Sequence, residues 1–146
     1  MKAKASIQGG DKLAQAIKSF DRDSLQKIQG IIDSSAQNIR NNAIRSIKNS
    51  PATGRTYKRG AVTHQASSAG NPPKTDTGRL VGSISASVGQ LEAEIGAYVD
   101  YAVHLEFGTR NMSARPFMFP ALEQERKTFV RKMDNAIKDA IAKAGK

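Results

Sequence analysis

Two histidines and a few paired carboxylates are the side chains of this chain that could support catalysis or bind a metal ion. His104 lies two positions before Glu106, and such a pair could ligate a metal or transfer a proton. Neither a third ligand nor a positioned nucleophile accompanies it, so a surface or interface hydrogen bond is the favoured interpretation. Glu92 and Glu94 share a face of an expected strand, where pairing with cations of a neighbouring subunit is favoured over catalysis.

The motifs of cofactor and phosphate sites are also missing from the sequence. The chain has no cysteine, which excludes disulfides and thiolate metal sites. Its glycines do not form a phosphate-binding loop between a strand and a helix, and His64 lies in an expected loop. We therefore predict no catalytic residue, no metal, no cofactor and no enzymatic activity.

Two short stretches favour a binding function instead. Residues 106–109 place an acid and a large aromatic residue before a glycine, and residues 114–120 contain three large apolar side chains. A chain of this size is expected to bury only one or two of them, which predicts a subunit interface with Arg115 paired to a carboxylate across it. The alternative is that Phe117 and Phe119 only fasten the last helix to the sheet. The predicted interface residues are Tyr101, Glu106, Phe107, Thr109, Arg115, Phe117 and Phe119.

Alternating apolar and polar residues predict a small antiparallel sheet between residues 84 and 107. Three strands are expected, at residues 84–88, 91–99 and 101–107. Gly89 and Gln90 are expected to form the first hairpin turn, because glycine adopts the positive φ that such a turn requires. Residues 5–7 are expected to form a short edge strand.

Apolar residues spaced three or four apart predict helices at residues 11–20 and 23–49, and a last helix from about residue 116 to 142. Asp21 or Asp23 is expected to cap the second helix, and Pro51 to end it. The charged residues of the last helix, Glu125 among them, are expected on a solvated face. Its packing stripe is predicted at Leu122, Phe129, Met133, Ile137 and Ile141.

These elements predict an α+β fold in a single domain, residues 1–146. A small sheet of three to four strands is packed by a long N-terminal helix and a C-terminal helix. No run of about 18 apolar residues occurs, so no membrane span is expected.

Positive charge is concentrated in one part of the chain. The formal net charge is +10 at pH 7, and neither Asp nor Glu occurs between residues 33 and 76. Residues 51–75, the basic arm, are rich in Gly, Pro, Ser and Thr, which predicts an exposed loop with a partial hairpin around residues 58–60. Such an arm either contacts a polyanion or is a solvated loop. The predicted contacts to DNA or a partner are Arg55, Lys58, Arg59 and Lys74.

Short blocks of glycine, proline, charged and aromatic residues follow one another from residue 50 onward. They are Ser50-Pro51, Thr53-Gly54-Arg55, Tyr57, Arg59-Gly60, His64-Gln65-Ala66-Ser67, Gly70, Pro72-Pro73, Asp76-Thr77-Gly78-Arg79-Leu80, Ser83-Ile84, Tyr101-Ala102, Glu106-Phe107-Gly108-Thr109, Ala114-Arg115-Pro116-Phe117 and Pro120-Ala121. The blocks span residues 50–121, which is about half of the chain. In content and order they resemble the tail-completion proteins, also called head–tail joining or neck proteins, of long-tailed bacteriophages.

The resemblance implies a structural virion protein that forms a homo-oligomeric ring, with a hexamer favoured over a dodecamer. Such a ring joins the portal-side connector or head-completion proteins to the tail terminator or tail tube. Genomic DNA passes through its channel without sequence-specific contacts. The implied location is the virion neck, after assembly in the host cytoplasm, without a membrane partner.

Two alternatives are a free basic nucleic-acid-binding protein and the adjacent tail-terminator ring.

If all seven cations of the acid-free block, residues 34–75, faced the channel of a hexamer, they would hold the DNA instead of letting it pass. Only Arg55, Lys58 and Arg59 are therefore expected to approach the DNA.

Overall fold

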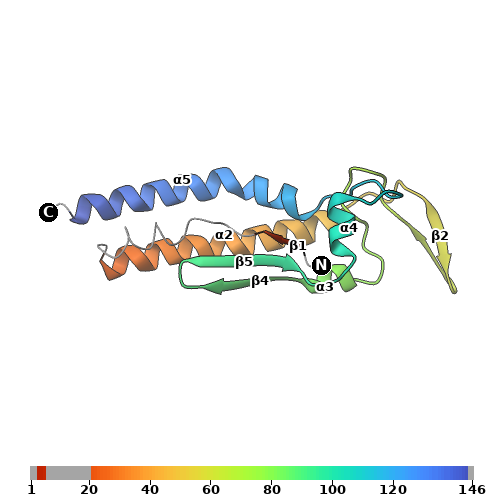
Figure 1. Cartoon of the computed structure of the whole chain (residues 1–146), viewed down its shortest axis with the longest axis horizontal. Coiled ribbons are helices and arrows are strands. Elements are labelled where there is room, and N and C mark those ends of the chain that lie inside the picture. The colour runs from red at the N-terminus through yellow and green to blue at the C-terminus, as the bar shows by residue number, and fades with distance from the viewer. Residues whose placement is uncertain (1–2, 6–20, 145–146) are drawn as a thin grey trace.

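The computed structural model of the chain describes residues 3–5 and 21–144. Its elements are β1 (Ala3–Ala5), α2 (Arg22–Lys48), β2 (Thr56–Arg59), β3 (Val62–Gln65), α3 (Arg79–Ser83), β4 (Ile84–Gly89), β5 (Glu92–Ala97), α4 (Ala102–Phe107) and α5 (Met118–Ala144). The predicted α+β class is confirmed. The two long helices run along the molecule, and the β2–β3 hairpin projects from one end (Figure 1). The helix expected at residues 11–20 and most of the edge strand expected at 5–7 lie outside the described residues.

Helix α2 is the middle layer of the fold, with the sheet on one side and α5 on the other (Figure 1). It begins where the Asp21 carboxylate accepts a hydrogen bond from the backbone N of Ser24 at 2.9 Å, as an N-cap does. It ends at Lys48, because Pro51 follows closely and the residue before a proline avoids helical geometry. The predicted apolar stripe is confirmed, with buried or half-buried Leu25, Ile28, Ile32, Ala36, Ile39, Ala43 and Ile47.

The main sheet has the strand order β1-β5-β4, and both pairings are antiparallel. The prediction of a third strand at residues 101–107 is wrong, since residues 102–107 form the helix α4. The second edge of β5 is already paired with β1. In α4 the buried side chains are Ala102 and Glu106, one helical turn apart, while Tyr101 and Phe107 are exposed. The period-two apolar pattern of this stretch therefore does not match its burial.

The turn between β4 and β5 lies one residue later than predicted. Gly89 pairs with Glu92, so the two turn residues are Gln90 and Leu91, and Leu91 has a φ of 58°. The side chain of Gln29 in α2 holds this turn. It donates to the Gly89 carbonyl at 3.0 Å and accepts from the Leu91 amide at 2.8 Å. These contacts, together with packing of Leu91 in an apolar cluster with Ile28, offset the cost of left-handed backbone.

Helix α5 packs against α2 mainly through small residues. Ala121, Ala136 and Ala140 are buried, whereas Ile141, predicted on the packing stripe, is 58% exposed. Glu125, predicted on a solvated face, is buried instead. Its Oε1 accepts hydrogen bonds from Ser35 Oγ at 2.9 Å and Asn38 Nδ2 at 3.2 Å, so a polar contact lies within the helix pair. Alanines permit the close approach of the helices that buries this carboxylate.

Replacing Gly30 with alanine is predicted to stabilise the chain by about 0.5–1 kcal/mol, because glycine is a poor residue for a helix interior. Gly30 lies on the exposed side of α2, and an added Cβ would meet nothing within 4 Å. Chemical denaturation monitored by circular dichroism measures the difference. Gly54→Ala is the matched control and is expected to lower the stability, since its Cβ would lie 2.2 Å from the Ser67 carbonyl oxygen. An unchanged or lower stability of Gly30→Ala would contradict the prediction.

Candidate functional site

A buried carboxylate connects α4 to the start of α5. Glu106 is 5% exposed, and its Oε2 accepts hydrogen bonds from the backbone N of Phe117 at 2.9 Å and of Met118 at 3.0 Å. Its Oε1 accepts from the backbone N of Phe119 at 2.8 Å. The next residue, Pro120, has no N–H. The amide donors that the first turn of a helix leaves unpaired are therefore all accounted for.

This cap determines which aromatic side chains are available at the junction. Phe117 is fully buried in the core, whereas Phe107 is 72% exposed and Phe119 is 61% exposed. Phe117 thus belongs to the core of a single chain, which was the alternative considered for it. Glu106 is likewise buried within the single chain, as an intramolecular cap. Of the predicted interface aromatics, Tyr101, Phe107 and Phe119 remain at the surface.

The loop between α4 and α5 contains the other two predicted interface residues. Thr109 is exposed at a tight turn, where its amide donates to the Met112 carbonyl at 2.8 Å. Gly108 has a φ of 77°, and a Cβ there would lie 2.7 Å from the same carbonyl oxygen, so glycine is required. Arg115 is half-buried, and its amide donates to the Leu105 carbonyl at 2.7 Å. The loop is thereby fastened to the end of α4.

The basic arm forms the predicted hairpin, whose strands β2 and β3 are almost entirely exposed. The base of the hairpin is anchored to the body of the subunit. Ala66 and Ser67 are buried, the Gly54 amide donates to the Ala66 carbonyl at 2.7 Å, and Ser50 Oγ donates to the Pro72 carbonyl. The arm is therefore an ordered projection with a packed base (Figure 1).

The four cations predicted to contact DNA or a partner do not form one group. The side chains of Arg55 and Lys58 are exposed on the hairpin and make no contact with an acid among the described residues. Arg59 instead pairs with Asp76, its Nη1 lying 2.9 Å from Oδ2. Lys74 lies in the following loop, where its Nζ donates to the Lys48 carbonyl at 3.4 Å.

A cleft of about 560 Å³, here called the arm cleft, lies between the base of the hairpin and the α3–α4 end of the body. Arg59 and Lys74 line it, whereas Arg55 and Lys58 do not. Arg79 and Arg115 also face it, together with the ring of Tyr101. Sequence analysis did not group these residues, because the cleft depends on how the hairpin closes onto residues 73–81. The only usable signal was the short distance in sequence between Lys74, Asp76 and Arg79.

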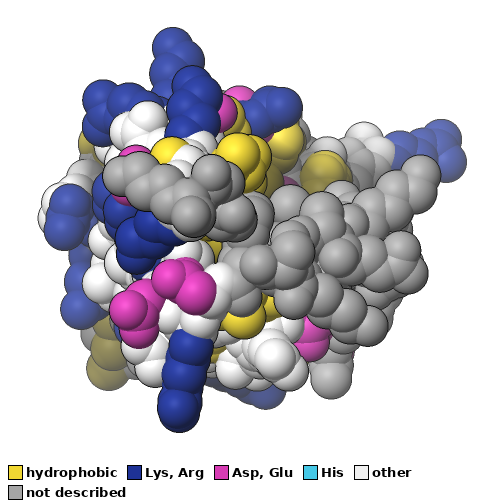
Figure 2. All heavy atoms as spheres, turned by 90° about the vertical axis from the view of Figure 1, so that its left-hand side faces the viewer, with side chains coloured by type: hydrophobic (Ala, Val, Ile, Leu, Met, Phe, Trp, Pro, Cys, Tyr) yellow, Lys and Arg dark blue, Asp and Glu magenta, His cyan; other side chains and the backbone are white. Residues whose placement is uncertain are grey.

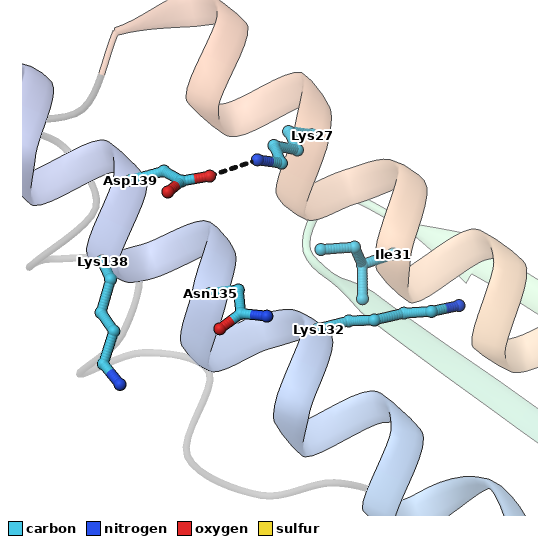
Figure 3. A pocket seen from close by; sticks show the side chains of 6 residues that line it. All are labelled: Lys27, Ile31, Lys132, Asn135, Lys138 and Asp139. Carbon is cyan, nitrogen blue, oxygen red and sulfur yellow. Dashed lines mark hydrogen bonds and ion pairs between the residues drawn. The ribbon is translucent and has the colours of Figure 1, made fainter.

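A second cleft, of about 580 Å³, lies between α2 and α5 at the opposite end. Figure 2 views that end, where Lys and Arg side chains stand out from the described surface. Within the cleft, Lys27 Nζ lies 2.5 Å from Asp139 Oδ2 (Figure 3). Lys138 points away from the gap and pairs with Asp134 at 2.7 Å. Most of the positive charge here is neutralised, so this cleft is a poor anion site.

The remaining candidates for chemistry are dispersed. His104 is exposed on α4, and His64 Nδ1 lies 3.6 Å from Asp76 Oδ1 beside the arm. Glu92 is exposed on β5, while Glu94 accepts a hydrogen bond from Tyr98 Oη at 3.2 Å. Within residues 3–5 and 21–144, no group of three His, Asp or Glu side chains could hold a metal ion. Nor is any helix in that part long and apolar enough to cross a membrane.

Comparison of the chain with protein-family models, with curated proteins and with solved structures gave no match.

Replacing Glu106 with glutamine is predicted to destabilise the chain by about 2–4 kcal/mol, because hydrogen bonds to a charged group and a helix cap are lost together. The amide retains one acceptor oxygen, and its NH₂ group then faces a backbone donor. Equilibrium unfolding in urea measures the loss. Glu123→Gln, which removes an exposed pair with Arg126 on the same helix, is expected to cost less than about 0.5 kcal/mol. Equal losses for both variants would contradict the role of Glu106.

Lys27 is predicted to hold the pKa of Asp139 below its ordinary value of 3.8, first through its hydrogen bond and then through its charge. A lowered pKa means that the pair stabilises the fold above the unfolded-state pKa, and that this contribution is lost as the pH falls through the folded-state pKa. In Lys27→Met the pKa of Asp139 should therefore rise. Titration of the carboxyl ¹³C resonance measures it. Lys132→Met, a change in the same cleft without contact to Asp139, should leave the midpoint unchanged; a shift of equal size would refute the pairing.

Proposed function

We propose that this chain is a structural subunit of a ring at the neck of a long-tailed bacteriophage. The ring joins the head connector to the tail and surrounds the channel through which DNA passes. The ordered sequence blocks between residues 50 and 121 support the family resemblance, and the geometry of the α4–α5 junction supports self-association. Catalysis has no part in this function.

The observation on which the proposal depends is the exposure of Phe107 and Phe119. They are the two most exposed large apolar side chains of the described residues, at 72% and 61%. Glu106 lies next to Phe107 in sequence and accepts the Phe119 amide, so the backbones of both aromatic residues are fixed before any partner binds. Rigid exposed aromatic residues are the typical anchors of protein interfaces, because ordering them costs little further entropy.

The arrangement of the subunit suits a head-to-tail contact in a closed ring. The hairpin and the α4–α5 junction lie at one end of an elongated body, and the start of α2 and the end of α5 lie at the other (Figure 1). Contacts between unlike surfaces of identical subunits generate rings when the rotation closes. Phe107 and Phe119 then contact a different surface of the next subunit.

The basic arm provides the contact with DNA in this proposal. Arg55 and Lys58 are exposed on a hairpin that projects from the body, and no acid of the described residues neutralises them. Two free cations on each subunit attract the phosphate backbone without reading its sequence. This modest charge is compatible with DNA that must move through the channel.

Association and DNA binding distinguish the proposal from its main alternative. A ring subunit is expected to assemble at micromolar concentration in analytical ultracentrifugation and to bind free duplex DNA weakly. A free nucleic-acid-binding protein would remain a monomer or dimer, and the logarithm of its affinity would fall steeply with the logarithm of the salt concentration. Electron microscopy of rings bound to connector or tail-tube proteins would distinguish a tail-completion ring from a tail-terminator ring.

Replacing Phe107 and Phe119 with alanine is predicted to weaken ring assembly by about tenfold or more while the monomer stays folded, because interface anchors contribute more than 1 kcal/mol each. Sedimentation velocity measures assembly, and circular dichroism measures the fold. Phe117→Ala is the matched comparison, since loss of this fully buried ring is expected to cost about 3–5 kcal/mol of stability. A Phe107→Ala, Phe119→Ala variant that assembles normally would exclude this interface.

A further inference from the structure

The arm cleft contains more positive charge than its own acid can neutralise. Asp76 is already engaged by Arg59 at 2.9 Å and lies 3.6 Å from His64 Nδ1. Three further cations line the cleft, and none of them forms an ion pair with an acid of the described residues. They are Lys74, Arg79 and Arg115. The cleft therefore has a net excess of positive charge, unlike the cleft between α2 and α5, where Lys27 and Lys138 are each paired with an acid.

Two buried polar atoms in residues of this cleft lack a hydrogen-bond partner within the described part of the chain. They are Arg115 Nε and Thr75 Oγ1. A buried donor without an acceptor costs about 1–3 kcal/mol, and a guanidinium cannot relieve this cost by losing its proton. The Nε itself has almost no exposed surface, so a ligand in the cleft meets Arg115 at its terminal guanidinium nitrogens, which form no hydrogen bond among the described residues. A carboxylate matches the planar fork of an arginine with two parallel hydrogen bonds.

The position of Arg115 is fixed before a ligand arrives. Its backbone amide donates to the Leu105 carbonyl at 2.7 Å, and Phe117, two residues later, is fully buried. The Arg59–Asp76 pair also lies in the lining of the cleft. The backbone that carries the Arg115 side chain is therefore in place before a ligand binds, which lowers the cost of ordering the site.

We propose that the arm cleft binds a carboxylate side chain from an acidic segment of a partner protein. Besides its cations, the cleft has apolar walls that include Ile47, Leu80 and Leu105. Such walls accommodate the aliphatic stem of a glutamate and the backbone of a peptide. A DNA duplex presents its phosphates on a broad convex surface, which fits a cleft of this size less well than a single carboxylate side chain does.

Charge also argues against a second copy of this chain as the occupant. Most acids of the described residues already form a hydrogen bond or an ion pair within the subunit. Those that form none are Asp23, Glu92 and Asp100. The fitting partner is a different, acidic protein, and this inference does not require that the chain form a ring.

A fluorescein-labelled hexaglutamate peptide tests the site by fluorescence anisotropy with the full chain. Arg115→Gln is expected to weaken binding by about 10-fold to 100-fold, as loss of a charged bidentate hydrogen bond predicts. Arg79→Gln, an exposed change in the same cleft, should weaken it less while leaving the fold intact. Arg110→Gln, an exposed change outside the cleft, is the control for net charge and should change affinity by less than about threefold.

Equal losses for Arg110→Gln and Arg115→Gln would overturn the proposal, because binding would then follow net charge alone. So would an effect of Arg115→Gln on a duplex oligonucleotide but not on the peptide. If circular dichroism shows that Arg115→Gln does not fold, the test uses Arg79→Gln instead. An unchanged affinity of Arg79→Gln for the peptide would then refute the site. The Phe107→Ala, Phe119→Ala variant separates this proposal from the ring. It should bind the peptide like the unmodified chain, so failure of assembly and failure of the cleft are distinguishable.

Discussion

The hydrogen bonds accepted by the Glu106 carboxylate are the interaction on which the α4–α5 junction depends. The carboxylate accepts the amides of Phe117, Met118 and Phe119, and thereby fixes both where α5 begins and how α4 is oriented toward it. A charged acceptor at a helix N-terminus is favoured by the helix dipole as well as by the hydrogen bonds. Because the cap of α5 comes from α4, the folding of one helix is coupled to the folding of the other. The loop between the two helices closes onto the basic arm.

The rest of the architecture is narrow. Helix α2 separates a sheet of three short strands from α5, and alanines allow the two helices to approach. Such a layer arrangement buries few large side chains for its length, and it leaves apolar residues on the outer side of α5. Val130 and Ile141, each more than half exposed, follow Phe119 at intervals of 11 residues, which is three helical turns. A long molecule with exposed apolar positions would be stabilised by any partner that covers them.

Local sequence patterns predicted the parts of this fold that depend on periodicity and on turn residues. The stripe of α2, the β4–β5 pairing and the hairpin in the basic arm follow from periodicity and turn residues. Residues 101–107 were misassigned because β1 occupies the edge of β5 that a further strand would need, and because the buried residues of α4 are Ala102 and Glu106, which the alternating pattern does not mark. The turn at Leu91 and the burial of Phe117 depend on Gln29 and Glu106, partners 62 and 11 residues away, which no local pattern contains.

The basic arm illustrates how a count of charges differs from the charge that a partner meets. The block between residues 33 and 76 contains no acid, yet Asp76 directly follows it and neutralises Arg59 once the hairpin closes. The other cations of the basic arm lie in two separate places. Arg55 and Lys58 project with the hairpin, where water and salt screen their charge. Lys74 lies in the arm cleft, where lower solvent exposure makes each charge count for more. One sequence block thus contributes weak, screened charge at the hairpin and stronger charge in the cleft.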